Sequence, residues 1–396
     1  MNEQQKALVR ATIPVLQRSG VALASHFYQR MLTYNPELKH VFNHGHQQDG
    51  RQPQALAGAV LAYAEHIDDP TVLLPVVERI AHKHVSLGIR AEHYAIVGKH
   101  LLASIQEVLG EAATTALVDA WAAAYHQLAQ LFIGIESDLY QQHIATEGGW
   151  TGWRPFRIVR KQIESEEITS FYLRPLDGGQ LPTYQPGQYI SLRVYVEQLG
   201  CYQPRQYSLS NVATGSEFRI SVKREMAGNA TPAGAVSNLL HTDYDVNDML
   251  ELSAPTGDFV LQQDSQRPVV LLSGGVGITP MLAIAQSLLQ QGTRPLHFVH
   301  AARNPQVHAF KALSDEFAEQ GAQVHYFYDE QGGSEPPRTR APFALTEVLP
   351  PSATDAEYYL CGPLAFMQHY ITELRAYGVP ESQIYAEVFG SGGLPA

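Results

Sequence analysis

The stretch Pro268-Val-Val-Leu-Leu-Ser-Gly-Gly-Val-Gly-Ile-Thr-Pro-Met281 decides the fold of the last third of the chain. Its apolar first half is typical of a parallel strand that is covered on both faces. The glycines allow close approach of a pyrophosphate, and Thr279 and Pro280 predict an N-cap and a first-turn proline of the next helix. A glycine turn without a ligand is the alternative. The candidate binding residues are Gly274, Gly275, Val276, Gly277, Ile278, Thr279 and Pro280.

Further apolar runs follow at Leu296–Val299 and Tyr358–Leu360, with helical stretches between them. Strands that alternate with helices predict a parallel α/β sheet, here over residues 263–396. Upstream, short alternating strands such as Phe218–Lys223 are punctuated by turns such as Asp177-Gly178-Gly179. This pattern predicts an antiparallel β domain over residues 148–262.

Residues 1–147 show helical periodicity instead. Apolar side chains recur every three or four positions in a long terminal segment: Val118, Trp121, Ala122, Tyr125, Leu128, Phe132, Ile135 and Leu139. This spacing is typical of an amphipathic helix. The predicted order is therefore all-α, then antiparallel β, then parallel α/β.

Composition excludes several classes of protein. The net charge of −12 argues against a nucleic-acid partner, and no apolar run approaches the roughly 20 residues of a membrane helix. Two cysteines, Cys201 and Cys361, provide neither a disulfide framework nor a cysteine-based metal site. The start Met1–Lys6 is polar and lacks a signal-peptide apolar region. We expect a cytoplasmic monomer with no transmembrane segment.

Two helical faces of the first domain carry polar residues at apolar positions. Val77, Ile80 and His84 share one face of a predicted helix, so His84 is a core residue, a helix C-terminal cation or an axial haem ligand. Gln52 leads a second apolar stripe through Leu56. With Tyr28 it is suited to donate hydrogen bonds to a diatomic ligand on iron. Alternatively, Tyr28 and Gln52 satisfy each other or solvent.

The β domain carries the strand Arg205-Gln206-Tyr207-Ser208, which supplies a cation, an aromatic face and a hydroxyl. These groups suit a flavin and its pyrophosphate, although so short a pattern is also compatible with an ordinary strand. Downstream, Gly234 to Leu240 predicts a small-residue loop that enters a helix. The free N–H groups of such a helix start suit a phosphate.

Residues 1–147 resemble the globin domain of bacterial and yeast flavohaemoglobins. The matching stretches are Ala11–Leu16, His26–Tyr28, Asn35–Lys39, Lys83-His84 and Tyr94–Leu102. The resemblance implies that His84 is the proximal ligand of haem b and that Phe42 wedges the porphyrin. It further implies that Tyr28, Gln52 and Leu56 line the distal pocket. Tyr94 and Glu136 would hydrogen-bond around the proximal imidazole, and a carboxylate there makes the imidazole more electron-rich.

Residues beyond 148 resemble the ferredoxin–NADP reductase-like superfamily, which implies that the FAD domain is an antiparallel β-barrel. The resemblance spans essentially the whole chain. It implies FAD contacts from Tyr189, Arg205, Gln206, Tyr207, Ser208, Val236 and Ser237. It implies NADH or NADPH at Gly274–Pro280 and at Cys361, Gly362 and Pro363, with a terminal segment over the flavin at Glu387, Val388, Phe389 and Gly390. The loop Met226–Ala233 is longer than the usual connection.

The resemblance implies a nitric oxide dioxygenase that converts NO and O₂ to nitrate with electrons from NAD(P)H, through FAD and haem b. It also suggests a Lys83–Glu387 bridge between the globin and the reductase. Two alternatives remain: a haem-linked reductase of hydroperoxides or ferric chelates, and a haem-based gas sensor. The preference for NADH or NADPH stays open. Arg303, which follows the second strand of the nucleotide domain, either meets a 2′-phosphate or faces water.

Overall fold

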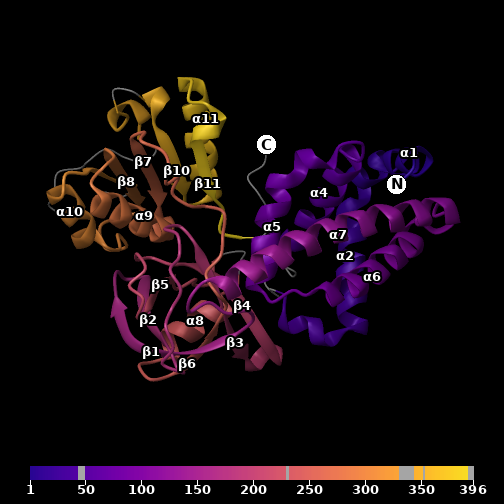
Figure 1. Cartoon of the computed structure of the whole chain (residues 1–396), viewed down its shortest axis with the longest axis horizontal. Coiled ribbons are helices and arrows are strands. Elements are labelled where there is room, and N and C mark those ends of the chain that lie inside the picture. Colours follow the sequence, from indigo (N-terminus) through magenta and orange to yellow (C-terminus); the bar gives the residue numbers. More distant parts are fainter. Residues whose placement is uncertain (43–49, 229–231, 330–342, 351–352, 391–396) are drawn as a thin grey trace. The chain divides into compact units, whose positions relative to one another are not determined.

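The computed structural model describes residues 1–42, 50–228, 232–329, 343–350 and 353–390. The chain divides into two compact units (Figure 1). The first unit holds residues 1–153 and 193–205, and the second holds residues 154–192 and 206–390. In the described ranges, no helix combines the length and apolar character needed to cross a bilayer.

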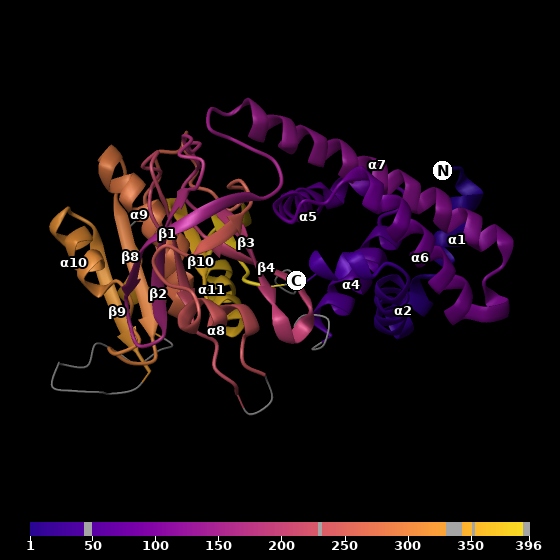
Figure 2. The same ribbon diagram turned by 90° about the horizontal axis from the view of Figure 1, so that it is seen from below.

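The first unit is helical. Its α-helices are α1 (Glu3–Ala11), α2 (Ile13–Tyr34), α4 (Arg51–Glu65), α5 (Leu74–Ser86), α6 (Ala91–Leu109) and α7 (Thr115–Ala145). The long α7 begins after Thr114, whose hydroxyl accepts a hydrogen bond from the N–H of Leu117 at 3.2 Å. Figure 2 shows α7 running along α5 and α6. Its apolar positions therefore cover two helices at once.

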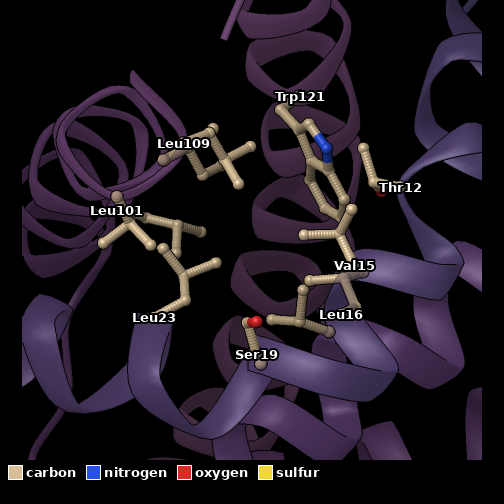
Figure 3. Close-up of a pocket in the computed structure, with 12 residues that line it drawn as sticks. Thr12, Val15, Leu16, Ser19, Leu23, Leu101, Leu109 and Trp121 are labelled. Atoms are coloured by element: carbon tan, nitrogen blue, oxygen red, sulfur yellow. The ribbon is translucent and has the colours of Figure 1, made fainter. Parts of the chain in front are cut away.

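The main core of this unit lies between α2, α4, α6 and α7, around Phe27, Met31 and Ile105. It encloses an apolar cavity of about 20 Å³, with Leu23, Leu101 and Trp121 among its walls (Figure 3). A cavity of this size has room for little more than one water-sized molecule. A smaller core of Val77, Ala81 and Phe132 joins α5 to α7. This smaller core fixes the helix that carries His84.

After the helices, the chain forms a six-stranded sheet in the order β4-β3-β6-β1-β2-β5. The strands are β1 (Arg154–Ile163), β2 (Ile168–Pro175), β3 (Tyr189–Val196), β4 (Cys201–Ser208), β5 (Phe218–Lys223) and β6 (Met249–Leu252). β1 pairs antiparallel with β2 and β6, and β2 pairs antiparallel with β5. The helix α8 (Ala235–Thr242) lies between β5 and β6 in the sequence.

A five-stranded parallel sheet follows, in the order β11-β10-β7-β8-β9. Its elements are β7 (Val269–Gly274), α9 (Ile278–Gln291), β8 (Leu296–Ala302), α10 (Lys311–Glu319), β9 (Gln323–Tyr328), β10 (Glu357–Cys361), α11 (Leu364–Tyr377) and β11 (Ile384–Glu387). One core packs α9 and α10 against the sheet, and another packs α11 against it. The predicted order of all-α, antiparallel β and parallel α/β is confirmed.

One local prediction is wrong. Thr279 is not the N-cap of α9, because the helix already begins at Ile278, after a 3₁₀ turn over Gly275–Gly277. The Thr279 hydroxyl instead donates to the carbonyl of Val276 at 3.0 Å. Pro280 does lie in the first turn, and Gly292 ends the helix with a φ of 64°.

Candidate functional site

The side chains predicted to surround the proximal haem ligand are centred on His84, near the end of α5. Its Nδ1 lies 2.7 Å from Oε1 of Glu136 on α7 and 3.1 Å from the hydroxyl of Tyr94 on α6. The Tyr94 hydroxyl also donates to Glu136, and Glu136 is only 3% exposed. Both contacts of the imidazole are at Nδ1, so Nε2 is the ring nitrogen that can coordinate iron.

Electrostatics keep the tyrosine of this cluster protonated. Burial and the neighbouring charge of Glu136 raise the pKa of the Tyr94 phenol, so the phenol remains a donor. The Tyr125 hydroxyl donates to the backbone carbonyl of Tyr94 at 2.6 Å, and the Phe132 ring lies 5.5 Å from the His84 ring. The sequence marked Tyr125 and Phe132 only as core positions of the long helix. Their roles beside the imidazole depend on tertiary packing.

Two residues predicted for the distal pocket, Tyr28 of α2 and Gln52 at the start of α4, lie close together. Burial raises the pKa of the Tyr28 phenol, and a hydrogen bond with the side chain of Gln52 opposes that rise. Within the described residues, the buried Oε1 of Gln52 has no hydrogen-bond partner. An orphaned acceptor of this kind is costly unless a ligand or water completes it.

Apolar groups surround this pair. The Phe42 ring lies 5.7 Å from the Tyr28 ring in an edge contact, and Leu56 packs on the same core one helical turn from Gln52. Four of the predicted haem-pocket residues therefore lie together, and their roles stay predictions. Lys83 precedes His84 on α5, in the first unit, whereas Glu387 ends β11 in the second. Their pairing also stays a prediction.

Five of the seven predicted flavin residues lie at the ends of two neighbouring strands. Tyr189 begins β3, and the backbones of Tyr189 and Thr256 exchange two hydrogen bonds of 2.9 Å. Gly257, at a φ of +125°, runs so close to the Tyr189 ring that a Cβ there would lie 3.0 Å from it. Four residues end β4: Arg205, Gln206, Tyr207 and Ser208. The Gln206 amide donates to the Ser191 hydroxyl at 3.1 Å, which orients this strand end.

The predicted phosphate loop enters α8 after Gly234. Val236 and Ser237 are buried in its first turn, where helical N–H groups have no partner inside the helix. The Ser237 hydroxyl accepts from the N–H of Glu225 and donates to the carbonyl of Gly234, each at 3.2 Å. It therefore shapes the loop, and the backbone is left to meet an anion. The middle of the Met226–Ala233 segment lies outside the described residues.

Two loops converge at the carboxyl edge of the parallel sheet. A Cβ at Gly277 would lie 2.1 Å from the carbonyl oxygen of Cys361, and one at Gly274 would lie 3.0 Å from Cδ of Pro363. A Cβ at Gly362 would lie 3.0 Å from the backbone nitrogen of Gly274. Only glycines permit this packing, so the glycine loop after β7 and the Cys361–Pro363 turn form one surface. A nucleotide that approaches one loop meets the other.

The same edge aligns three residues on adjacent strands. Cys361 of β10 pairs in register with Ser273 of β7 on one side and with Glu387 of β11 on the other. Burial and the charge of Glu387 hold the pKa of the Cys361 thiol well above its usual range, so the thiol remains protonated. Val388, Phe389 and Gly390 continue from this strand, and Phe389 is exposed. An exposed aromatic beside this edge is suited to cover a planar ligand.

Three family models match consecutive parts of the chain. The globin model matches residues 25–131, the oxidoreductase FAD-binding domain model matches residues 155–261, and the oxidoreductase NAD-binding domain model matches residues 271–371. Each match falls within one of the three regions that the sequence pattern distinguishes, residues 1–147, 148–262 and 263–396.

Curated relatives match the chain along its length. A flavohemoprotein of Chromobacterium violaceum is 55% identical and covers 99% of this chain and 98% of its own length. One of Bordetella parapertussis is 56% identical, with both chains fully covered. The structure of a Malassezia yamatoensis flavohemoglobin with bound FAD and heme matches 98% of this chain and 99% of its own, at 28% identity and a TM-score of 0.87. Identity above one half along nearly the whole length shows that this chain belongs to the flavohemoprotein family.

Proposed function

We propose that this chain is a nitric oxide dioxygenase with the overall reaction 2 NO + 2 O₂ + NAD(P)H → 2 NO₃⁻ + NAD(P)⁺ + H⁺. The observation that carries the proposal is the Tyr28–Gln52 pair with its orphaned amide oxygen, in the same helical unit as the His84–Glu136–Tyr94 cluster. A reductase domain from Vibrio cholerae, described as part of a nitric oxide dioxygenase, adds support. It is 41% identical over 60% of this chain and 98% of its own, with a TM-score of 0.56.

The residues fit the three cofactors of the family. His84 would hold haem b through Nε2, with Phe42 and Leu56 as apolar walls. The FAD contacts would come from the set Tyr189, Arg205, Gln206, Tyr207, Ser208, Val236 and Ser237. The nicotinamide nucleotide would bind at Gly274–Pro280 and Cys361–Pro363, with Glu387–Gly390 over the flavin. Gly277, Gly274 and Gly234 allow these loops to pack closely, because a Cβ there would meet Cys361, Pro363 or Ser237. The backbone N–H groups at the helix starts would then meet the phosphates.

Haem supplies redox-active iron when bound, and FAD converts the hydride of NAD(P)H into single electrons. The chain supplies orientation and charge. Glu136 holds the Nδ1 proton of His84 and makes the imidazole a stronger electron donor. Burial keeps the Tyr28 hydroxyl protonated, so it would donate to a ligand on the distal side, with Leu56 as an apolar wall. We further propose that the enzyme is cytoplasmic and monomeric.

The test is NO consumption by the purified holoenzyme with O₂ and NADH, with nitrate as the measured product. Omission of either O₂ or NADH should abolish turnover. The absorption spectrum should show a Soret band with a flavin shoulder, and His84→Ala should lose the Soret band but keep the flavin. Cumene hydroperoxide consumption that exceeds NO consumption would instead favour the peroxidase alternative. NO binding without nitrate formation would favour a sensor.

A further inference from the structure

An ion pair lies immediately beyond the second strand of the parallel sheet. Arg303 follows Ala302, the last residue of β8, and its Nη2 donates to Oε1 of Glu167. The Glu167 side chain is 30% exposed and that of Arg303 57% exposed, so the pair lies at the surface. The two residues are 136 positions apart, so the sequence alone does not suggest their contact.

The position of Arg303 relates it to the nucleotide ribose. β7 and β8 are parallel neighbours, and Gly274 of the glycine loop pairs in register with Ala301. In nucleotide-binding parallel sheets the pyrophosphate lies at the loop after the first strand. The residue after the neighbouring strand meets the 2′ position of the adenosine ribose, where an arginine accommodates a 2′-phosphate. Arg303 stands two residues beyond Ala301, so its guanidinium is in reach of that position.

Glu167 is held in place by its surroundings as well as by the arginine. Its neighbour Ile168 is only 3% exposed and belongs to the core that contains α9 and Phe310. The N–H of Glu166 donates to the carbonyl of Gln306 at 3.3 Å, and the N–H of Arg224 donates to the carbonyl of Glu167 at 2.8 Å. These three attachments hold the backbone of Glu167 beside the β8–α10 connection, so its side chain stays close to Arg303.

We propose that Glu167 is a specificity determinant that makes the reductase prefer NADH over NADPH. It occupies the guanidinium that would bind a 2′-phosphate, and its fixed negative charge repels that dianion. An exposed ion pair is weak by itself, so the discrimination depends on the repulsion by an anchored carboxylate. NADH has only a ribose hydroxyl at this position and is not repelled. The inference rests on only one part of the proposed function, the reduction of the flavin by a nicotinamide nucleotide.

The test is anaerobic stopped-flow reduction of the flavin in the full-length holoenzyme, with NADH and NADPH titrated separately. Glu167→Gln should improve the Kd for NADPH by about tenfold, the order expected from removing one like charge near the phosphate. The limiting rate of reduction and the Kd for NADH should not change. As a direct probe, 2′,5′-ADP should bind the variant more tightly than the parent, and 5′-ADP equally. The gain should shrink as salt is raised.

Two variants control for a general charge effect. Glu166→Gln removes an exposed carboxylate from the same turn and should leave both Kd values unchanged. Arg303→Gln added to Glu167→Gln should abolish the gain. An unchanged NADPH/NADH ratio in Glu167→Gln, or an equal gain in Glu166→Gln, would overturn the proposal. Flavin reduction needs neither NO nor O₂, so a chain that fails to make nitrate still gives a clear answer.

Discussion

Nδ1 of His84 and the buried carboxylate of Glu136 lie 2.7 Å apart, and each comes from a different helix. The contact fixes which ring nitrogen carries the proton and leaves Nε2 as the possible ligand. Tyr94 donates to the same carboxylate oxygen, so the charge of Glu136 is shared by two donors inside the protein. The proximal cluster is therefore already formed by the chain itself.

Glu136→Gln tests the charge of this cluster. The amide still accepts a hydrogen bond but carries no negative charge, so we expect the haem reduction potential to rise and NO consumption to fall by about tenfold or more. Potentiometric titration and NO-electrode assays give the two quantities. Asp138→Asn, an exposed change on the same helix, is the matched control. An unaltered potential in Glu136→Gln would contradict the electronic role of the carboxylate.

Tyr28→Phe tests the distal donor. The ring keeps its edge contact with Phe42 while the hydroxyl is lost. One donated hydrogen bond is worth about 1.4 kcal/mol or somewhat more to a charged acceptor, so we expect O₂ to dissociate about ten times faster. Stopped-flow displacement of O₂ by CO measures the rate. An unchanged rate would show that Tyr28 does not donate to the ligand.

The pH dependence of the same rate offers a separate test. Burial raises the pKa of Tyr28 above its ordinary value of 10.0, and a raised pKa in an acid favours the protonated form. The donor should therefore persist past the pH at which an exposed tyrosine ionises. We expect the O₂ dissociation rate in the parent to stay flat up to about pH 10. An increase near pH 9 that is absent from Tyr28→Phe would contradict this.

How much of this could be predicted from the sequence differs between residues. Helical spacing predicts that His84, Gln52 and Leu56 lie on apolar faces of their helices, because the spacing itself sets which residues share a face. Their roles at a haem stay predictions. The prediction of Thr279 as the N-cap of α9 is wrong, because a 3₁₀ turn over Gly275–Gly277 leads directly into the helix. Gly277 packs against Cys361, a contact between distant segments that the sequence does not reveal. A single sequence also does not reveal the register between parallel strands. The alignment of Cys361 with Ser273 and Glu387 appeared only in the structure.

The buried histidine pair of the nucleotide domain predicts acid sensitivity. The rings of His300 and His308 lie 4.7 Å apart, and burial lowers the pKa of His308 to about 4. The unfolded chain takes up a proton near pH 6.5 and the folded chain does not, so stability is present above that pH and is lost as pH falls toward 4. At pH 5, His308 alone should lower local stability by about 2 kcal/mol.

Hydrogen exchange of peptides from β8 and β9, corrected for intrinsic rates, measures this loss between pH 7.5 and 5. His308→Gln removes one titrating group, so its exchange should change less with pH than that of the parent. Equal pH sensitivity in the parent and the variant would show that the pair does not carry the effect.

Gly277→Ala tests the convergence of the two nucleotide loops. Its Cβ would lie 2.1 Å from the carbonyl oxygen of Cys361 and 2.7 Å from the N–H of Gly362, so the backbone must shift. We expect the Kd for NADH in anaerobic flavin reduction to rise by about tenfold or more, because small displacements at such a site are costly. The flavin spectrum should be unchanged.

Gly292→Ala separates this clash from simple backbone strain, since Gly292 has a φ of +64° and nothing within 4 Å of its Cβ position. This variant should lose about 1 kcal/mol of stability at the end of α9 and bind NADH normally. If Gly277→Ala bound NADH as tightly as the parent, the two loops would not form a single nucleotide surface. If both variants lost NADH equally, the loss would reflect the stability of α9, with no contribution from the contact between the glycine loop and Cys361.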